Sequence, residues 1–244
     1  KDKKMSCRWF FFLLLVCSLY SVAAEEPKKI LYISAANSWN NWTAVESFSG
    51  GRWSIIPVDL EGFGETMQKG NFQSALDKYE DKLRLLISLL NPIIVIVASK
   101  GLNVLTHLAN INIYNGPAIL LSPIPNKCDH IHGETWKEEW TSSMKVLKDK
   151  IIGPVGIGIG TSMDEQDLIM TQINETSVCG DLSLQKTKKR VVFEHCPNWF
   201  LRSFPGDHRW KNQDSNVVNI ASLITDVLES RNECLTQSCE DVSA

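Results

Sequence analysis

The chain lacks the surplus of basic residues that proteins binding nucleic acids carry. Its 244 residues include 25 Lys and Arg against 28 Asp and Glu, which gives a net charge of −3. No basic stripe is present, and the short run of cations at residues 186–190 is interpreted as a solvated approach to a strand. This charge balance argues against DNA or RNA as a partner.

The chain also lacks internal repeats, low-complexity linkers and an apolar run long enough for a comfortable membrane span. Its main apolar block, residues 9–20, follows basic residues and is followed by Val22-Ala23-Ala24. This order is typical of a secretory signal cut after Ala24, and the block's length disfavours the alternative of an anchoring helix. We therefore expect residues 1–24 to be a signal peptide and the protein to be secreted, without a stable membrane anchor.

Without the signal, 220 residues remain, which is the size of one domain with a full core. We expect that domain to span residues 25–233 and a polar tail to follow at 234–244. The signal contains four of the basic residues and one of the acidic ones, so the secreted chain has a net charge near −6.

The secreted part of the chain contains an odd number of cysteines. At most two disulfides can form among them, and one thiol stays free or pairs between chains. A local bridge between the last two is one option that the spacing leaves open. The five residues are Cys128, Cys179, Cys196, Cys234 and Cys239.

Two sequons are consistent with secretion. Asn41-Trp42-Thr43 and Asn174-Glu175-Thr176 both match the acceptor pattern for N-linked glycans. Asn41 and Asn174 are therefore predicted glycosylation sites.

Apolar segments and helical patterns alternate along the chain. Because the apolar runs are continuous rather than alternating, they predict a mostly parallel sheet buried on both faces, a three-layer α/β sandwich. Residues 123–150 are polar and lack a strong period, so we expect a small cap over the carboxyl ends of the strands, with an ordinary surface excursion as the alternative. The expected strands lie near residues 30–34, 53–58, 93–97, 118–122, 155–160 and 190–195.

The turn after the strand at residues 93–97 is the most informative part of the chain. Ala98-Ser99-Lys100-Gly101 leads straight into a helical pattern, so Ser99 lies in a cramped strand-to-helix turn with small or apolar neighbours. A serine hydroxyl at the mouth of a helix is a candidate nucleophile, because the free backbone amides there favour an anion. The alternative is that the serine merely caps the helix.

A nucleophilic serine needs a base, and the base needs an acid to orient it. Asp164 follows the strand at 155–160, and His208 lies in the loop before the last helix, so the chain order is Ser, Asp, His. That order is the one found in α/β-hydrolases. Asp164 is therefore the candidate acid and His208 the candidate base, with Glu165, Asp167 and His195 as weaker rivals.

These residues resemble the α/β-hydrolase superfamily over nearly all of the secreted chain. Residues 59–64 (Asp-Leu-Glu-Gly-Phe-Gly) are similar to the family's Asp-Leu-Pro-Gly-Phe-Gly loop, and Ser99 falls on its nucleophile. Residues 160–164 and 206–208 resemble its acid and base loops. The Ser122-Pro123-Ile124-Pro125 segment, followed by Cys128-Asp129 and a short cap, is similar to the compact abhydrolase domain-containing 14 group.

Three departures from the family pattern stand out. Val97 replaces the usual Gly two residues before the serine, and Ser34-Ala35-Ala36 replaces a His-Gly pair. By resemblance, the backbone amides of Ala36 and Lys100 are then left to form the oxyanion hole. The amino-terminal hairpin is also missing, so we expect about six strands where the family builds eight.

Other chemistries fit the chain less well. Cys128, His130 and His132 with Asp129 could approach one ion, but two-residue spacing without a distant fourth ligand is unlike zinc sites. Glycines at 156, 158 and 160 lack the dinucleotide-binding spacing. We therefore expect no metal and no organic cofactor. Of the eight tryptophans, those predicted to line an apolar acyl pocket are Trp39, Trp42, Trp136 and Trp140.

The function expected from the sequence is that of a secreted serine esterase acting on a small acyl-containing substrate through Ser99, His208 and Asp164. The alternative is a non-catalytic secreted protein, binding an extracellular or matrix partner, on a degenerate hydrolase scaffold, because a fold does not determine activity.

Overall fold

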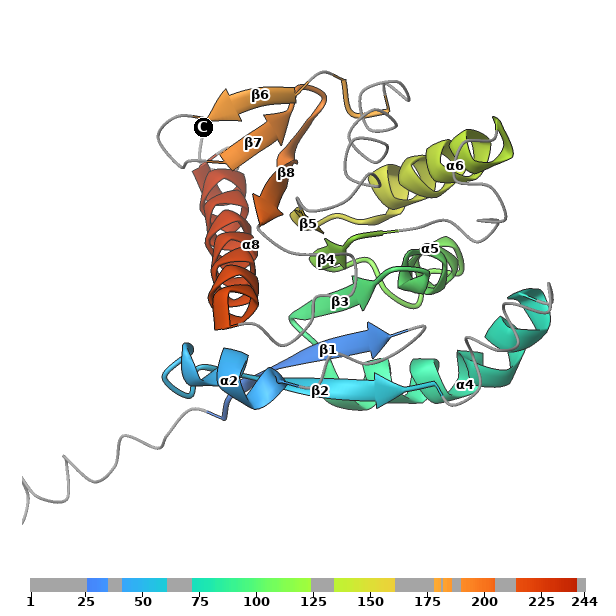
Figure 1. Ribbon diagram of the computed structural model, residues 1–244, viewed down its shortest axis with the longest axis horizontal. Coiled ribbons are helices and arrows are strands. Elements are labelled where there is room, and N and C mark those ends of the chain that lie inside the picture. Colours follow the sequence, from blue (N-terminus) through green and yellow to red (C-terminus); the bar gives the residue numbers. More distant parts are fainter. Residues whose placement is uncertain are drawn as a thin grey trace, which may run out of the picture.

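The apolar segments form one eight-stranded sheet in the order β2-β1-β3-β4-β5-β8-β7-β6 (Figure 1). The computed structural model describes residues 26–34, 41–60, 72–123, 134–160, 178–180, 182–185, 190–204 and 214–240. In the sheet, β2, β1, β3, β4, β5 and β8 run parallel to one another. β7 and β6 add an antiparallel edge next to β8, so the mostly parallel α/β class is confirmed. The strands are β1 (Lys28–Ser34), β2 (Trp53–Asp59), β3 (Ile94–Ala98), β4 (Ala118–Leu121), β5 (Val155–Gly160), β6 (Leu182–Gln185), β7 (Arg190–Phe193) and β8 (Cys196–Phe204).

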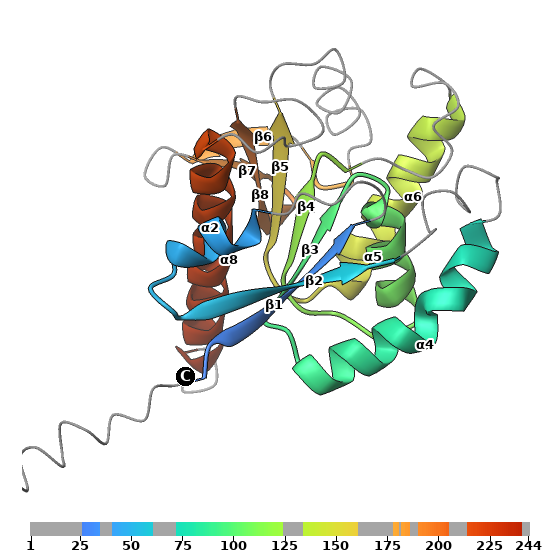
Figure 2. The same ribbon diagram turned by 60° about the horizontal axis from the view of Figure 1, so that its bottom comes forward.

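Helices cover both faces of the sheet (Figures 1 and 2). One face carries α2 (Trp42–Ser47) and α8 (Asp214–Glu240), and the other carries α4 (Phe72–Leu90), α5 (Gly101–Asn110) and α6 (Glu134–Lys150). The chain steps from β1 outward to β2 and then back past β1 to β3. Connections between parallel strands are right-handed. The reversal of direction therefore places α2, which connects β1 to β2, and α4, which connects β2 to β3, on opposite faces of the sheet.

The central strands are buried on both sides. In β1, Leu31 and Ile33 join the core cluster under α4, α5 and α6, while Ile30 and Tyr32 join the cluster under α2 and α8. Successive side chains of a strand point to opposite faces, so a strand covered on both sides needs apolar residues at every position. This requirement explains the continuous apolar runs in the sequence.

The glycines of β5 allow α8 to lie close against the sheet. A Cβ added at Gly156 would meet Val227 at 3.0 Å and Leu223 at 3.1 Å, and one added at Gly158 would meet Leu223 at 3.2 Å. A larger residue at either position would force the helix outward. These glycines therefore have a packing role in the structure.

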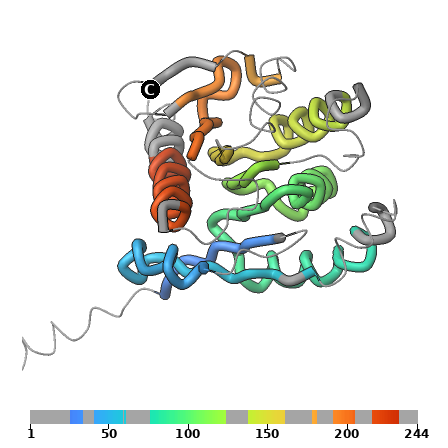
Figure 3. Tube along the Cα trace, in the orientation of Figure 1, coloured from blue at the N-terminus to red at the C-terminus, as the bar shows by residue number. Residues whose placement is uncertain are grey.

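The edge formed by β6, β7 and β8 differs from the sequence prediction. The predicted sixth parallel strand at residues 190–195 is the antiparallel β7, and the parallel neighbour of β5 is β8. Figure 1 shows this meander, in orange, at one edge of the sheet, and Figure 3 shows the traces of β7 and β8 there. The expectation of about six strands was thus short by two. Exposed Pro197 and Asn198 near the start of β8 gave that segment the appearance of a break.

Part of the predicted cap is a sheet-covering helix instead. Helix α6 connects β4 to β5 and packs against α5. Its buried residues Trp140, Met144 and Leu147 recur at intervals of four and three, which is one face of a helix. Because charged residues lie between these three, the sequence analysis did not detect the helical period. Residues 124–133 of the predicted cap lie outside the described residues.

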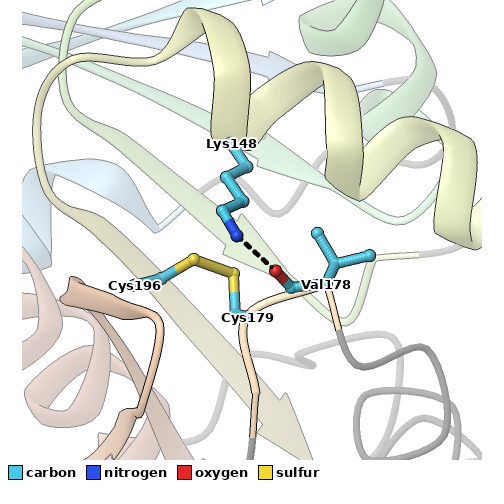
Figure 4. The surroundings of a disulfide bond; sticks show 4 residues. All are labelled: Lys148, Val178, Cys179 and Cys196. Carbon is cyan, nitrogen blue, oxygen red and sulfur yellow. Dashed lines mark hydrogen bonds between the residues drawn. A yellow bond between two sulfur atoms is a disulfide. The ribbon is translucent and has the colours of Figure 1, made fainter.

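A disulfide joins Cys179 to Cys196 at the start of β8 (Figure 4). Next to it, Lys148 Nζ of α6 donates a hydrogen bond to the carbonyl oxygen of Val178 at 2.6 Å. The covalent bond and the hydrogen bond together hold residues 178–180 against both β8 and α6. The sequence had left this pairing open.

Helix α8 continues through Cys234 and Cys239 to Glu240, where a polar tail was expected. Five residues of an α-helix rise about 7.5 Å along its axis, beyond the usual Cα separation of a disulfide. A bridge between these two cysteines is therefore incompatible with the helical backbone observed here.

Candidate functional site

Ser99 occupies a two-residue turn between β3 and α5. Only Ser99 and Lys100 separate Ala98, the last residue of β3, from Gly101, the first of α5. The φ angle of Ser99 is +52°, in the left-handed region that residues other than Gly and Asn rarely adopt. The turn is therefore strained, as a nucleophile elbow is.

Gly101 is the residue that makes this turn sterically feasible. A Cβ at position 101 would lie 3.1 Å from the carbonyl oxygen of Ile33 and 3.1 Å from the Cβ of Val97. Val97 is the β-branched residue that departs from the family pattern. The structure accommodates it because the opposing position carries no side chain.

Hydrogen bonds hold the turn in place. The Ser99 amide donates to the Leu121 carbonyl of β4 at 2.9 Å, and the Leu102 amide donates to the Ser99 carbonyl at 3.2 Å. Asn103 is buried and donates to the Lys100 carbonyl twice, from its amide at 3.1 Å and from Nδ2 at 3.0 Å. The serine thus sits on a backbone fixed from both the sheet and the helix.

The start of α5 is also compatible with the helix-cap alternative for Ser99, because the Ser99 carbonyl accepts a hydrogen bond from the Leu102 amide. Lys100, between Ser99 and α5, already has a helical backbone with φ −61° and ψ −7°. Within the described part of the chain, the Lys100 amide donates to no backbone carbonyl. It is one of the amides at a helix start that lack an intrahelical acceptor.

Ser122 is a second serine at the same end of the sheet, and the sequence analysis gave it no role. It follows β4, is buried, and has a φ of +40°. Its amide donates to the Gly158 carbonyl of β5 at 2.8 Å. Its sequence signal was weak, because a serine before a proline marks many turns.

Most of the other predicted site residues fall where no structural statement is made. Trp136 belongs to α6, but its side chain is not described. The rival His195 lies in the exposed turn between β7 and β8, where its amide donates to the Cys179 carbonyl at 2.8 Å. The remaining candidates, the other rivals and the cysteine-histidine cluster lie outside the described residues. These are Ala36, Trp39, Cys128, Asp129, His130, His132, Asp164, Glu165, Asp167, Asn174 and His208.

Three predicted residues can be placed. Trp140 is fully buried in the core cluster beneath α6. Trp42 is buried in the cluster under α2 and α8, with its ring centroid 4.2 Å from that of Tyr32 and tilted by 50° to it. Both therefore pack in the core. Asn41 is partly exposed before α2, and its side chain makes no capping hydrogen bond to that helix.

A perturbed carboxyl ties α4 to α5 away from the turn. A hydrogen bond from His107, in the last turn of α5, lowers the pKa of Glu80, and one from Arg84 adds to the effect. The His107 Nε2 to Glu80 Oε2 distance is 2.9 Å, and the Arg84 to Glu80 distance is also 2.9 Å. This cluster is a link between helices rather than part of the Ser99 turn.

The described residues contain neither a membrane-spanning helix nor a cluster of metal ligands. No helix among them combines the length and apolar character needed to cross a membrane. No three His, Cys, Asp or Glu side chains of the described part gather where they could hold a metal ion. No protein-family model, curated protein or solved structure matches the chain.

Proposed function

We propose that this protein is a serine hydrolase of the esterase type with Ser99 as its nucleophile. The observation that carries the proposal is the φ of +52° at Ser99, in a two-residue turn from a buried strand into a helix. A strained turn of this kind exposes the hydroxyl at the end of the sheet. Strain persists where the surrounding structure enforces it, and it concentrates at active sites.

The sheet register supports the partners proposed for Ser99. Gly160 at the end of β5 pairs with Phe204 at the end of β8, so both strands finish level at the carboxyl end of the sheet. Asp164 and His208 each follow their strand by four residues. β8 lies three strands from β3, or about 14 Å, and four extended residues span about the same distance. Both loops can therefore reach Ser99.

In the proposed reaction, Ser99 Oγ attacks the acyl carbon while His208 takes its proton, and Asp164 orients the imidazole. The amides of Lys100 and Ala36 donate to the oxyanion of the tetrahedral intermediate. The alcohol then leaves with the proton from His208, and water hydrolyses the acyl-enzyme by the same steps. These groups need no metal or organic cofactor.

The proposed family is the α/β-hydrolase superfamily, in its compact abhydrolase domain-containing 14-like group. A parallel sheet with helices on both faces supports this, as does the turn between β3 and α5. The substrate is then a small acyl ester bound at the carboxyl end of the sheet, with Trp39 and Trp136 as the proposed apolar walls.

Secretion and glycosylation at Asn41 and Asn174 are part of the proposal. The disulfide between Cys179 and Cys196 is compatible with an oxidising compartment. The partly exposed position of Asn41, without a capping bond, is compatible with a glycan.

The test is covalent labelling of the purified protein with a fluorophosphonate probe. We expect the wild type to be labelled and to hydrolyse p-nitrophenyl acetate, and both signals to vanish in Ser99→Ala and His208→Ala. Ser142→Ala is the matched control, because Ser142 is exposed on α6, and it should behave as the wild type. A wild type that is neither labelled nor active would refute the enzyme proposal and favour the non-catalytic binding protein.

The acid has its own test. Asp164→Asn should reduce ester turnover strongly because the imidazole loses its orienting partner. The neighbouring change Glu165→Gln should leave turnover near the wild-type value. The opposite pattern would transfer the role to Glu165.

A further inference from the structure

A groove opens at the amino end of the sheet, opposite the Ser99 turn. Its volume is about 660 Å³, within the range of small-molecule sites. It lies between the starts of β1, β2 and β3 and residues 225–232 of α8, and Figure 2 shows α8 running toward the start of β1. Because the two features are at opposite ends of the strands, this groove does not depend on the proposed esterase function.

Three cations from three different elements line the groove. Lys28 begins β1, Arg52 precedes β2, and Arg231 belongs to α8. The Lys28 amide donates to the Arg52 carbonyl at 3.1 Å, which places these two residues side by side. The Arg231 guanidinium reaches the Ile93 carbonyl at 3.4 Å, next to the start of β1.

These cations are not neutralised within the described part of the chain. Arg52 and Arg231 donate there only to backbone carbonyls, and none of the three cations forms an ion pair within 4.0 Å. Arg84 and Arg202, by contrast, are each paired with a carboxylate. Two guanidinium groups with spare N–H donors are suited to the oxygens of a tetrahedral anion.

Two carboxylates, those of Glu26 and Glu229, also line the groove. They leave a net charge of +1 there, which suits one anionic group and opposes a polyanion. Their oxygens can also accept hydrogen bonds from hydroxyl groups. The ligand that satisfies both kinds of group carries one tetrahedral anion on a hydroxylated body.

We propose that this groove binds a sugar carrying a single phosphate or sulfate ester. The anion lies between Arg52, Arg231 and Lys28, and the sugar hydroxyls face Glu26 and Glu229. Phosphate and sulfate esters share this chemistry, so the experiment separates them.

The experiment is isothermal titration of the purified full chain with glucose 6-phosphate, glucose 6-sulfate and unmodified glucose. We expect at least one ester to bind saturably with Kd below about 1 mM, more weakly in added salt, and glucose not to bind. The preferred ester identifies the anion. Absence of saturable binding by both esters up to about 10 mM, or equal binding of glucose, would overturn the proposal.

Variants test whether the groove is the site. Arg52→Gln combined with Arg231→Gln should weaken binding at least about tenfold, because two charge-assisted hydrogen-bonding groups are lost. Lys145→Gln, at an exposed position of α6, is the charge-matched control and should have no effect. Lys28→Gln replaces the double variant if that variant misfolds, and unchanged affinity in a folded groove variant would refute the site.

Discussion

The two ends of the sheet place positive φ angles on different kinds of residue. At the amino end, the non-glycine examples are Asn91, between α4 and β3, and Asn112, between α5 and β4. Asparagine tolerates this conformation and often ends helices. At the carboxyl end, the described residues with positive φ are Ser99 and Ser122, and serine does not favour this conformation. The amino end thus uses suitable residues, and the carboxyl end carries strain.

The charges of the two ends differ as well. The amino end holds the groove with three cations that form no ion pair within the described part of the chain, which suits binding of an anion already formed. The carboxyl end offers a hydroxyl and a backbone amide at a helix start, which suit charge that develops during a reaction. The two proposals accordingly assign chemistry to the Ser99 end of the sheet and anion binding to the amino end.

The largest expected effect is on the stability that α6 contributes. It distinguishes a helix packed on the sheet from a cap that lies over the carboxyl end of the strands. Trp140→Ala removes a fully buried ring and should lower the free energy of unfolding by about 3 to 5 kcal/mol. Urea denaturation measures this loss, with exposed Glu138→Ala as the control. A change below about 1 kcal/mol would mean that α6 lies loosely on the domain, as a lid does.

The next effect tests the close contact of Gly101 with Val97 and Ile33 beside the Ser99 turn. Gly101→Val should cost about 2 to 3 kcal/mol, since its Cβ alone would lie 3.1 Å from Val97 and from Ile33. Combining it with Val97→Gly removes one of the two clashes. We expect the double variant to lose less stability than the sum of the two single variants in urea denaturation. Simple additivity would contradict the proposed contact.

A smaller effect compares strain at the two ends directly. Ser99→Gly should raise the free energy of unfolding by about 0.5 to 1 kcal/mol, because glycine adopts φ +52° without steric cost. Asn91→Gly at the amino end should change it by less than about 0.5 kcal/mol. Thermal and urea unfolding provide the measurement. Destabilisation by Ser99→Gly would show that the serine side chain stabilises the turn and that the two ends do not differ in strain.

The smallest effect lies between the helices, away from both ends of the sheet. Because the pKa of Glu80 is lowered in the folded protein, its contribution to stability is present above pH 4.5 and declines as the pH falls through the folded value. Glu80→Gln should therefore be less stable than the wild type near neutral pH, and the difference should shrink on acidification. Unfolding curves from pH 7 to pH 3 measure it. A constant difference would mean that Glu80 acts by packing alone.

The sequence predicted the parts of the fold in which periodicity and burial agree. The strands near residues 30–34, 93–97 and 155–160 are buried on both faces, so their apolar runs were continuous and readable. In the β6 to β8 edge, β8 was missed because exposed residues interrupt its apolar pattern, and β7 was misassigned as its parallel neighbour. The period of α6 was hidden for the same reason. Of the site, the place of Ser99 between strand and helix was predictable, since that depends on local sequence.

The sequence by itself determined the α/β class and the position of Ser99 in a strand-to-helix turn, because both follow from local apolar periodicity and small residues. Only the tertiary structure decided the strain at Ser99, the need for glycine at 101 opposite Val97, and the pairing of Cys179 with Cys196. It also brought Lys28, Arg52 and Arg231 into one groove. Contacts between residues far apart in the chain depend on how strands and helices pack, and the local periodicity of the sequence does not specify that packing.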